Sequence, residues 1–235
     1  MGAALSEVLR HPAVWRGNSV GQVALPSIPT GFSRLDAELP GGGWPRGALT
    51  EIAFAREGIG ELSLLLPALA ALSRGELWVA LIAPPHLPYA PALALAGLDL
   101  ARVLVVRTAG SEQTLWAAEQ ALRSGSCAAV LAWPGAVSER GLRKLQFAAE
   151  TGKAWGVYFL AACAAPSVSP AALRLRLAPG GAGPAPDSIR GSATAGRGGD
   201  PAASEDAEEE GLRVHIVKRR GPGVAPFVLP LQRHR

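Results

Sequence analysis

Residues 55–63 have the spacing of a phosphate-binding loop, in which backbone amides and one lysine hold the phosphates of a nucleotide. The apolar run 49–54 before this segment is typical of a strand, and the run 61–73 after it is typical of a helix. A working loop of this kind connects a strand to a helix and has the pattern Gly-x-x-x-x-Gly-Lys-Ser/Thr. The sequence therefore predicts the frame of a phosphate-binding loop at this point.

The groups that would bind phosphate are replaced in this frame. Ala55 stands at the first glycine, Gly60 at the second, Glu61 at the lysine and Leu62 at the Mg²⁺-binding hydroxyl. Gly58 and Gly60 still permit a tight turn, and we expect Glu61 to lie in the first turn of the following helix, near its positive dipole. We predict a structural loop that does not bind ATP. It comprises Ala55, Gly58, Gly60, Glu61, Leu62 and Ser63.

The surrounding elements alternate between apolar strands and helical patterns. Continuous apolar runs predict strands that are buried on both faces of a parallel sheet, and the alternation predicts an α/β fold with helices flanking that sheet. The expected strands are 49–54, 77–83, 103–107, 128–132 and 155–163. The expected helices between them are 61–73, 91–96, 112–124 and 139–151.

The C-terminal part of the chain has a different pattern. Residues 173–177 and 212–218 alternate apolar and mostly basic residues, which predicts two half-exposed strands that pair antiparallel at the edge of the sheet. Residues 224–231 are a candidate for one more strand. Residues 179–211 are rich in Gly, Pro, Ala and Ser, hold seven acids and two arginines, and predict a disordered insertion.

Composition bounds the class of protein. With 235 residues, 49% hydrophobic and 18% charged, the chain is typical of a globular protein with one sizeable core. It has no apolar run long enough for a membrane span and no secretory signal, so we expect a cytoplasmic protein. Cys127 and Cys163 lie in apolar runs, which predicts buried thiols rather than a metal site. The net charge of +4 becomes +9 outside residues 179–211, which indicates either a genome that favours arginine or an acidic partner such as nucleic acid.

The segments 28–36 and 41–52 carry a family resemblance. They contain a Thr-Gly, a Leu-Asp and a Gly-rich turn before the strand that enters the loop, and in this they resemble the RecA-like recombinases. The order of strands and helices extends the resemblance to about residue 165. It implies an N-terminal helix and linker over 1–26 and a degenerate RecA-like domain over 27–235, with a mainly parallel sheet and antiparallel edge strands near the C-terminus.

The resemblance also implies which residues catalysis would need. The Walker B aspartate of the RecA-like ATPases corresponds here to Trp133, and their water-activating glutamate corresponds to Pro85. The neighbouring His86 is either a substitute base or an exposed turn residue. Together with Glu61 and Leu62, these replacements imply a pseudo-ATPase with no catalytic residues, no metal and no cofactor.

Within the RecA-like set, the N-terminal Trp-Arg-Gly, the degenerate loop and the Arg-rich C-terminus resemble the ImuA proteins. That resemblance implies an SOS-regulated accessory protein of translesion synthesis. The implied partners are an ImuB-type relative of Y-family polymerases, RecA and an error-prone replicative-type polymerase. The alternatives are a division inhibitor similar to SulA and a residual DNA-dependent ATPase.

Two clusters are candidates for partner or DNA contact. Trp15 and Arg16 either anchor a partner or pack on the chain's own core. Lys218, Arg219 and Arg220 either lie on a phosphate backbone, form a solvated turn or dock an acidic partner.

Overall fold

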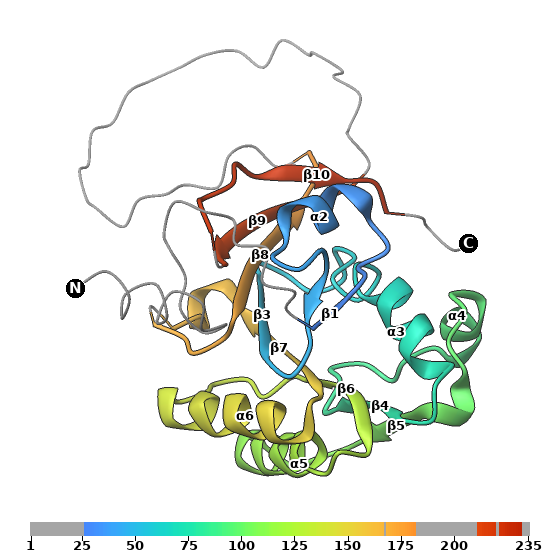
Figure 1. Cartoon of the computed structure of the whole chain (residues 1–235). Helices are drawn as coiled ribbons and strands as arrows, with labels where there is room; N and C mark the ends of the chain where they lie inside the picture. The colour runs from blue at the N-terminus through green and yellow to red at the C-terminus, as the bar shows by residue number, and fades with distance from the viewer. Residues whose placement is uncertain (1–25, 167, 182–210, 220, 232–235) are drawn as a thin grey trace, which may run out of the picture.

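The computed structural model describes residues 26–166, 168–181, 211–219 and 221–231, which form an α/β fold around one large sheet (Figure 1). The strands are β1 (Ser27–Ile28), β2 (Trp44–Pro45), β3 (Leu49–Phe54), β4 (Trp78–Ile82), β5 (Val103–Val106), β6 (Cys127–Ala132), β7 (Trp155–Ala161), β8 (Leu173–Pro179), β9 (Leu212–Lys218) and β10 (Phe227–Leu229). The α-helices are α2 (Ser33–Glu38), α3 (Leu66–Ser73), α4 (Ala90–Leu95), α5 (Ser111–Arg123) and α6 (Glu139–Gly152), with short 3₁₀ turns η1 (Leu100–Arg102) and η2 (Ala162–Ala164).

The large sheet is parallel in its core and antiparallel at one end. Its strand order is β10-β9-β8-β3-β7-β6-β4-β5. All pairs from β8 to β5 are parallel, whereas β9 pairs antiparallel with both β8 and β10. The predicted mainly parallel α/β sheet and the predicted antiparallel C-terminal strands are confirmed. The small pair β1–β2 is a separate antiparallel sheet.

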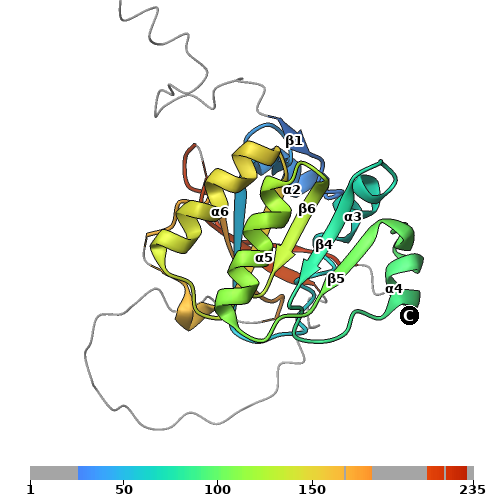
Figure 2. The ribbon, with the colours of Figure 1, turned by 90° about the horizontal axis from the view of Figure 1, so that it is seen from below.

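Helices cover the two faces of the sheet unequally. The helices α5 and α6 lie side by side over the parallel strands on one face (Figure 2). The helices α2, α3 and α4 pack on the other face. The alternate apolar side chains of β8, β9 and β10 belong to the core beneath α2 and α3, namely Leu173, Leu175, Leu177, Leu212, Val214, Ile216, Phe227 and Leu229. Among the described residues, the apolar cluster on the opposite face of the sheet contains no residue of β9 or β10.

The junction of α5 and α6 depends on one glycine. A Cβ on Gly152 would come within 1.9 Å of the Leu122 carbonyl oxygen, so only glycine permits this close approach. Helix α6 begins after Ser138, whose side chain accepts a hydrogen bond from the Gly141 amide. It ends at Lys153, which has a left-handed conformation with φ of 53°. These local features set the direction in which the chain enters β7.

Three expectations need correction. Strand β5 is not buried on both faces, because it is the last strand of the sheet and its Leu104 is 46% exposed. Strand β8 is not at the edge, because it pairs with β3, and the outer position belongs to β10. Cys127 is buried as predicted, but Cys163 is exposed because β7 ends two residues earlier, at Ala161. The described helices are all too short or too polar to cross a membrane.

A buried ion pair joins the parallel core to β8. Glu51, in the middle of β3, is 1% exposed, and its direct register partner on β8 is Arg174. Arg174 donates to Oε1 of Glu51 from Nη2 at 2.8 Å and from Nε at 2.9 Å. The Tyr158 hydroxyl donates to Oε2 of Glu51 at 2.5 Å and lies 2.8 Å from the Ser169 hydroxyl. Burial, followed by the hydrogen bond to Glu51, raises the pKa of Tyr158 far above its usual range.

The pair predicts a non-additive response to substitution. Arg174→Met removes the cation and leaves the Glu51 carboxylate buried without charge compensation, so unfolding in urea should be easier by about 3–5 kcal/mol. The double variant Glu51→Gln/Arg174→Met removes both charges and should recover most of that loss. The control Arg143→Met breaks an exposed pair with Glu139 and should cost at most about 0.5 kcal/mol. Equal losses in the single and double variants would contradict this account.

Candidate functional site

The loop after β3 is built around the side chain of Glu61. Gly58 has φ of +79° and Gly60 has φ of +103°, a conformation that favours glycine. The Gly58 amide donates to Oε1 of Glu61 at 3.0 Å, and the Gly60 amide donates to Oε2 at 3.1 Å. Both oxygens of one carboxylate are therefore bound by amides of the chain's own loop.

This arrangement places an internal anion among the amides of the loop. Backbone amides in loops of this type form a concave site for phosphate oxygens. Here two of them already have a carboxylate acceptor on the same loop. A phosphate that used these amides would have to displace the side chain and accept repulsion from its charge. The geometry is that of an anion site whose anion is Glu61.

The position of Glu61 corrects the prediction of a helix over 61–73. Helix α3 begins at Leu66, because Pro67, which lacks an N–H, occupies the first turn, where that donor is not needed. Leu62 and Ser63 lie in the preceding turn, which is closed by a bond from the Leu64 amide to the Gly60 carbonyl. Glu61 is thus not a first-turn acid of α3, and its stabilising partners are the loop amides rather than the helix dipole.

A second acid of the loop faces solvent. Glu57 and His86 are 3.4 Å apart, and their side chains are 48% and 84% exposed. An ion pair that is this exposed contributes little to stability. His86 is therefore an exposed turn residue, as one of the two interpretations predicted. Ala55, at the position of the first loop glycine, is also exposed.

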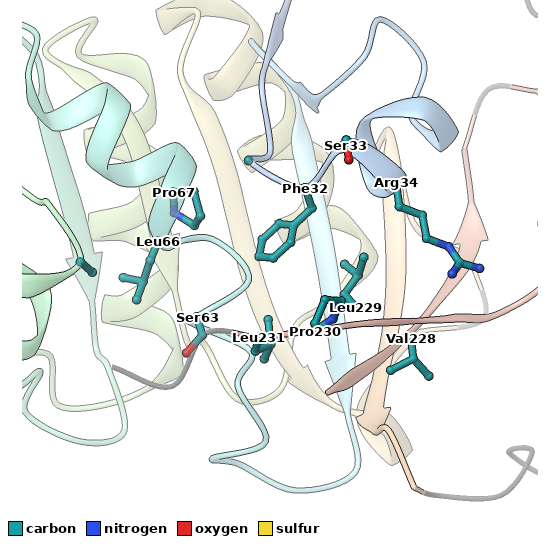
Figure 3. Close-up of a pocket in the computed structure, with 12 residues that line it drawn as sticks. Phe32, Ser33, Arg34, Ser63, Leu66, Pro67, Val228, Leu229, Pro230 and Leu231 are labelled. Carbon is teal, nitrogen blue, oxygen red and sulfur yellow. The ribbon is translucent and has the colours of Figure 1, made fainter. Parts of the chain in front are cut away.

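The C-terminal segment covers the other side of the loop. A Cβ on Gly60 would lie 2.3 Å from Cδ1 of Leu231, so the Leu231 side chain is packed directly against the glycine. Beside this contact is a cavity of about 700 Å³ between α2, the start of α3 and β10 (Figure 3). Its lining is mostly apolar and includes Phe32, Leu66 and Leu231. Arg34 is the cationic residue among the described residues that line it, and the Arg34 guanidinium lies 4.9 Å from the centre of the Phe227 ring. This lining suits an apolar group better than a triphosphate.

The other two positions implied by the RecA resemblance are Trp133, at the Walker B aspartate, and Pro85, at the water-activating glutamate. Trp133 follows β6 and stacks on Phe159, with ring centroids 4.5 Å apart and planes 10° apart. Pro85 lies two residues after Ala83. Ala83 has a left-handed φ of 52°, and its amide donates to the Val106 carbonyl. Within the described residues, no group of three or more His, Cys, Asp or Glu side chains is arranged to hold a metal ion.

Only two of the predicted partner residues, Lys218 and Arg219, lie among the described residues. Trp15, Arg16 and Arg220 lie outside the described residues. Nζ of Lys218 donates to the Ser169 carbonyl at 2.7 Å, and burial, followed by the nearby Arg174, lowers the pKa of Lys218. Arg219 donates to the Pro222 carbonyl at 3.0 Å and lies 3.4 Å from Glu38. These two side chains are partly committed to contacts within the chain.

Sequence reasoning missed the partner of Glu51 and the role of Leu231. A single acid in the otherwise apolar run 49–54 was a usable signal, because a buried carboxylate requires a cation or several donors. The alternating arginines of 173–177 were the available candidates. No local signal indicated that Leu231 covers Gly60, because the two residues are far apart in the sequence.

Comparison with known proteins assigns the chain to a family. The family model described as "Cell division inhibitor SulA" matches residues 47–156, which run from the start of β3 into β7 and include the loop. The SulA protein of Serratia proteamaculans is 30% identical over 120 residues, which are 51% of this chain and 71% of that protein. The chain belongs to the SulA family, within the RecA/SulA-like superfamily.

Relatives from both branches of the superfamily match. The SulA protein of Edwardsiella piscicida is 35% identical over 100 residues, 41% of this chain and 58% of that protein. The RecA protein of a Picosynechococcus strain is 31% identical over 114 residues, 48% of this chain and 32% of that protein. The crystal structure of SulA from Pseudomonas aeruginosa matches with 30% identity and a TM-score of 0.41, and covers 47% of this chain and 97% of that one. The chain therefore spans about a third of this RecA and somewhat over half of the Edwardsiella SulA.

The Glu61 contacts predict a local change in hydrogen exchange. Glu61→Ala removes the acceptor of the Gly58 and Gly60 amides, so both should exchange roughly tenfold faster, which corresponds to about 1.4 kcal/mol. Glu57→Ala is the matched control, since its carboxylate lies near His86 and accepts no bond from the loop amides. Amide exchange followed by NMR would measure both variants, and unchanged rates in Glu61→Ala would refute the proposed role of the carboxylate.

Proposed function

We propose that this chain is a non-catalytic RecA/SulA-like accessory protein of the SOS response, which binds other proteins and does not hydrolyse ATP. In the finer form of the proposal it is an adaptor of translesion synthesis that binds an ImuB-type relative of Y-family polymerases. Contacts with RecA, with an error-prone replicative-type polymerase and with DNA through the basic C-terminus belong to the same proposal. The observation that carries it is the Glu61 carboxylate bound to the loop amides.

Electrostatics supports the absence of ATP binding. A unit charge pair about 4 Å apart at an effective dielectric constant of about 20 is worth about 4 kcal/mol. With Glu61 in place of the lysine, that term is repulsive toward a triphosphate instead of attractive. Leu62 also supplies no hydroxyl for Mg²⁺, and Trp133 supplies no carboxylate. The residual-ATPase alternative is therefore the less supported one.

An exposed apolar edge supports binding to another protein. Strand β5 ends the sheet, and Leu104 and Val105 on it are 46% and 37% exposed. Leu100 in η1 and Trp78 at the start of β4 are about equally exposed. Exposed apolar side chains at and beside an unpaired strand edge are typical of a protein–protein contact surface. We call these four residues the β5 edge surface.

A second candidate function is inhibition of cell division. The observation that favours it is the match of residues 47–156 to the SulA family model. Overexpression separates the two candidates: filamentous cells would favour the inhibitor, and normal division with increased damage-induced mutagenesis would favour the adaptor.

We expect titration calorimetry with MgATP to give no binding heat at millimolar nucleotide. The variant Glu61→Lys/Leu62→Thr restores the lysine and hydroxyl of the loop pattern and should increase nucleotide affinity at least tenfold. The matched control Glu57→Lys changes the net charge by the same amount as Glu61→Lys but leaves the Glu61 contacts in place. Tight ATP binding by the unchanged chain would overturn the proposal.

The β5 edge surface should be needed to capture the polymerase relative. Leu104→Asp puts a charge among exposed apolar side chains, and we expect at least a tenfold loss of partner in a pull-down from damaged cells. Phe147→Asp is the control, because Phe147 is 62% exposed but lies on α6. If both variants retain the partner equally, the surface is not the docking site.

A further inference from the structure

The second face of β8 and β9 carries a row of basic side chains. The leucines of β8 point into the core beneath α2 and α3, so Arg174 and Arg176 lie on the opposite face. On β9 the same alternation places Arg213 and His215 on that face, where His215 is paired with Arg176 in the register. Two strands thus contribute basic residues to one face of the sheet.

A register irregularity adds one more cation. Between Arg174 and Leu175 the pairing with β9 shifts by one residue, so Lys218 is the register partner of Arg174. Without that shift, Val217 would occupy the position and Lys218 would be on the core side. We call Arg176, Arg213, His215 and Lys218 the β8–β9 basic face.

The basic face lacks compensating acids among the described residues. Arg174 is neutralised by Glu51, but Arg176 and His215 make no hydrogen bond or ion pair with any described residue. Within the described part of the chain, the Nε atoms of Arg176 and Arg213 are buried without an acceptor, and Nη2 of Arg213 donates to the Gly180 carbonyl. Arginines that no acid neutralises attract an anion to their face of the sheet, and His215 adds a hydrogen-bonding group beside Arg176.

The shape of the row selects the anion. Basic residues at alternate positions on neighbouring strands are about 6–7 Å apart along each strand, so they follow a line rather than converge on one point. Such a line fits a polymer with regularly repeated charges better than a small anion. Val228 of β10 lies beside Arg213, and the described residues of β8, β9 and β10 place no aromatic side chain on this face. Tyr158, farther along the same face, is 1% exposed, so it offers no ring for stacking on unpaired bases.

We propose that the β8–β9 basic face binds the phosphate backbone of double-stranded DNA without reading its sequence. The proposal extends beyond the adaptor role and does not depend on it, because it concerns a different surface and needs no protein partner. It shares Lys218 with the expected contact through Lys218, Arg219 and Arg220, but Arg176, Arg213 and His215 are not part of that expectation.

The test is DNA binding by the full chain, measured by fluorescence anisotropy with a labelled 30-base-pair duplex at several salt concentrations. Arg176→Gln/Arg213→Gln should weaken binding at least tenfold at low salt. The slope of log affinity against log salt should fall by about 1.8, because each lost duplex phosphate contact removes about 0.9. Arg140→Gln/Lys144→Gln, on the exposed face of α6, changes the net charge equally and should leave both quantities within experimental error.

A single substitution keeps the test valid if the double variant folds poorly. Arg176→Gln removes a side chain with no bond to any described residue, so folding should be unchanged and the salt slope should fall by about 0.9. Equal weakening in the α6 control, or unchanged binding in both Arg176 variants, would overturn the proposal. Competition by poly-glutamate as strong as that by unlabelled duplex, or tighter binding to single strands, would also overturn it. Because no partner is present, failure here leaves the adaptor proposal intact.

Discussion

The buried pair between Glu51 and Arg174 constrains how the C-terminal third of the sheet attaches to the core. The two residues face each other in the β3–β8 register, and Glu51 is almost fully inaccessible to solvent. A slip of one residue would turn Arg174 into the apolar core and leave Glu51 without its cation, so the alternative register is strongly disfavoured. Because β9 pairs with β8 and β10 pairs with β9, this register also sets the position of β10 and therefore that of Leu231 beside Gly60.

The loop after β3 has the glycine turn of a phosphate-binding loop but an acid at the position of its lysine. Gly58 and Gly60 both have positive φ, so the turn needs glycine whether or not a phosphate is present. The amides that this turn exposes need an acceptor, and Glu61 supplies one from within the loop. With an acid at the lysine position, the loop lacks that positive charge, and the acid accepts hydrogen bonds from the Gly58 and Gly60 amides. A glycine pattern alone cannot distinguish these two states, whereas the residue after the second glycine does.

Sequence reasoning located the elements because their signals are local. The run 49–54 coincides with β3, and the apolar–basic alternation identified β8 and β9, since both patterns arise from burial along one strand. It missed the start of α3, where Pro67 outweighs the apolar periodicity, and the interior place of β8, which depends on pairing with a distant strand. It also missed the basic face, because the register shift that turns Lys218 toward Arg174 is a property of two strands together. It missed the Glu61 contacts because a helix was expected from residue 61, which placed the carboxylate at the helix dipole rather than at the loop amides.

The sheet order separates the two surfaces to which we assign partners. The β5 edge surface, which includes Trp78 of β4, is at one end of the sheet, and β8 and β9 lie toward the other, with β3, β7 and β6 between them. Neighbouring strands are about 4.8 Å apart, so β4 and β8 are about 19 Å from each other. That exceeds the Debye length of about 8 Å at physiological salt, so charge on bound DNA would be largely screened at the β5 edge. The two ligands would then neither compete for space nor repel each other, and one molecule of this chain could hold a protein at one end of its sheet and duplex DNA near the other.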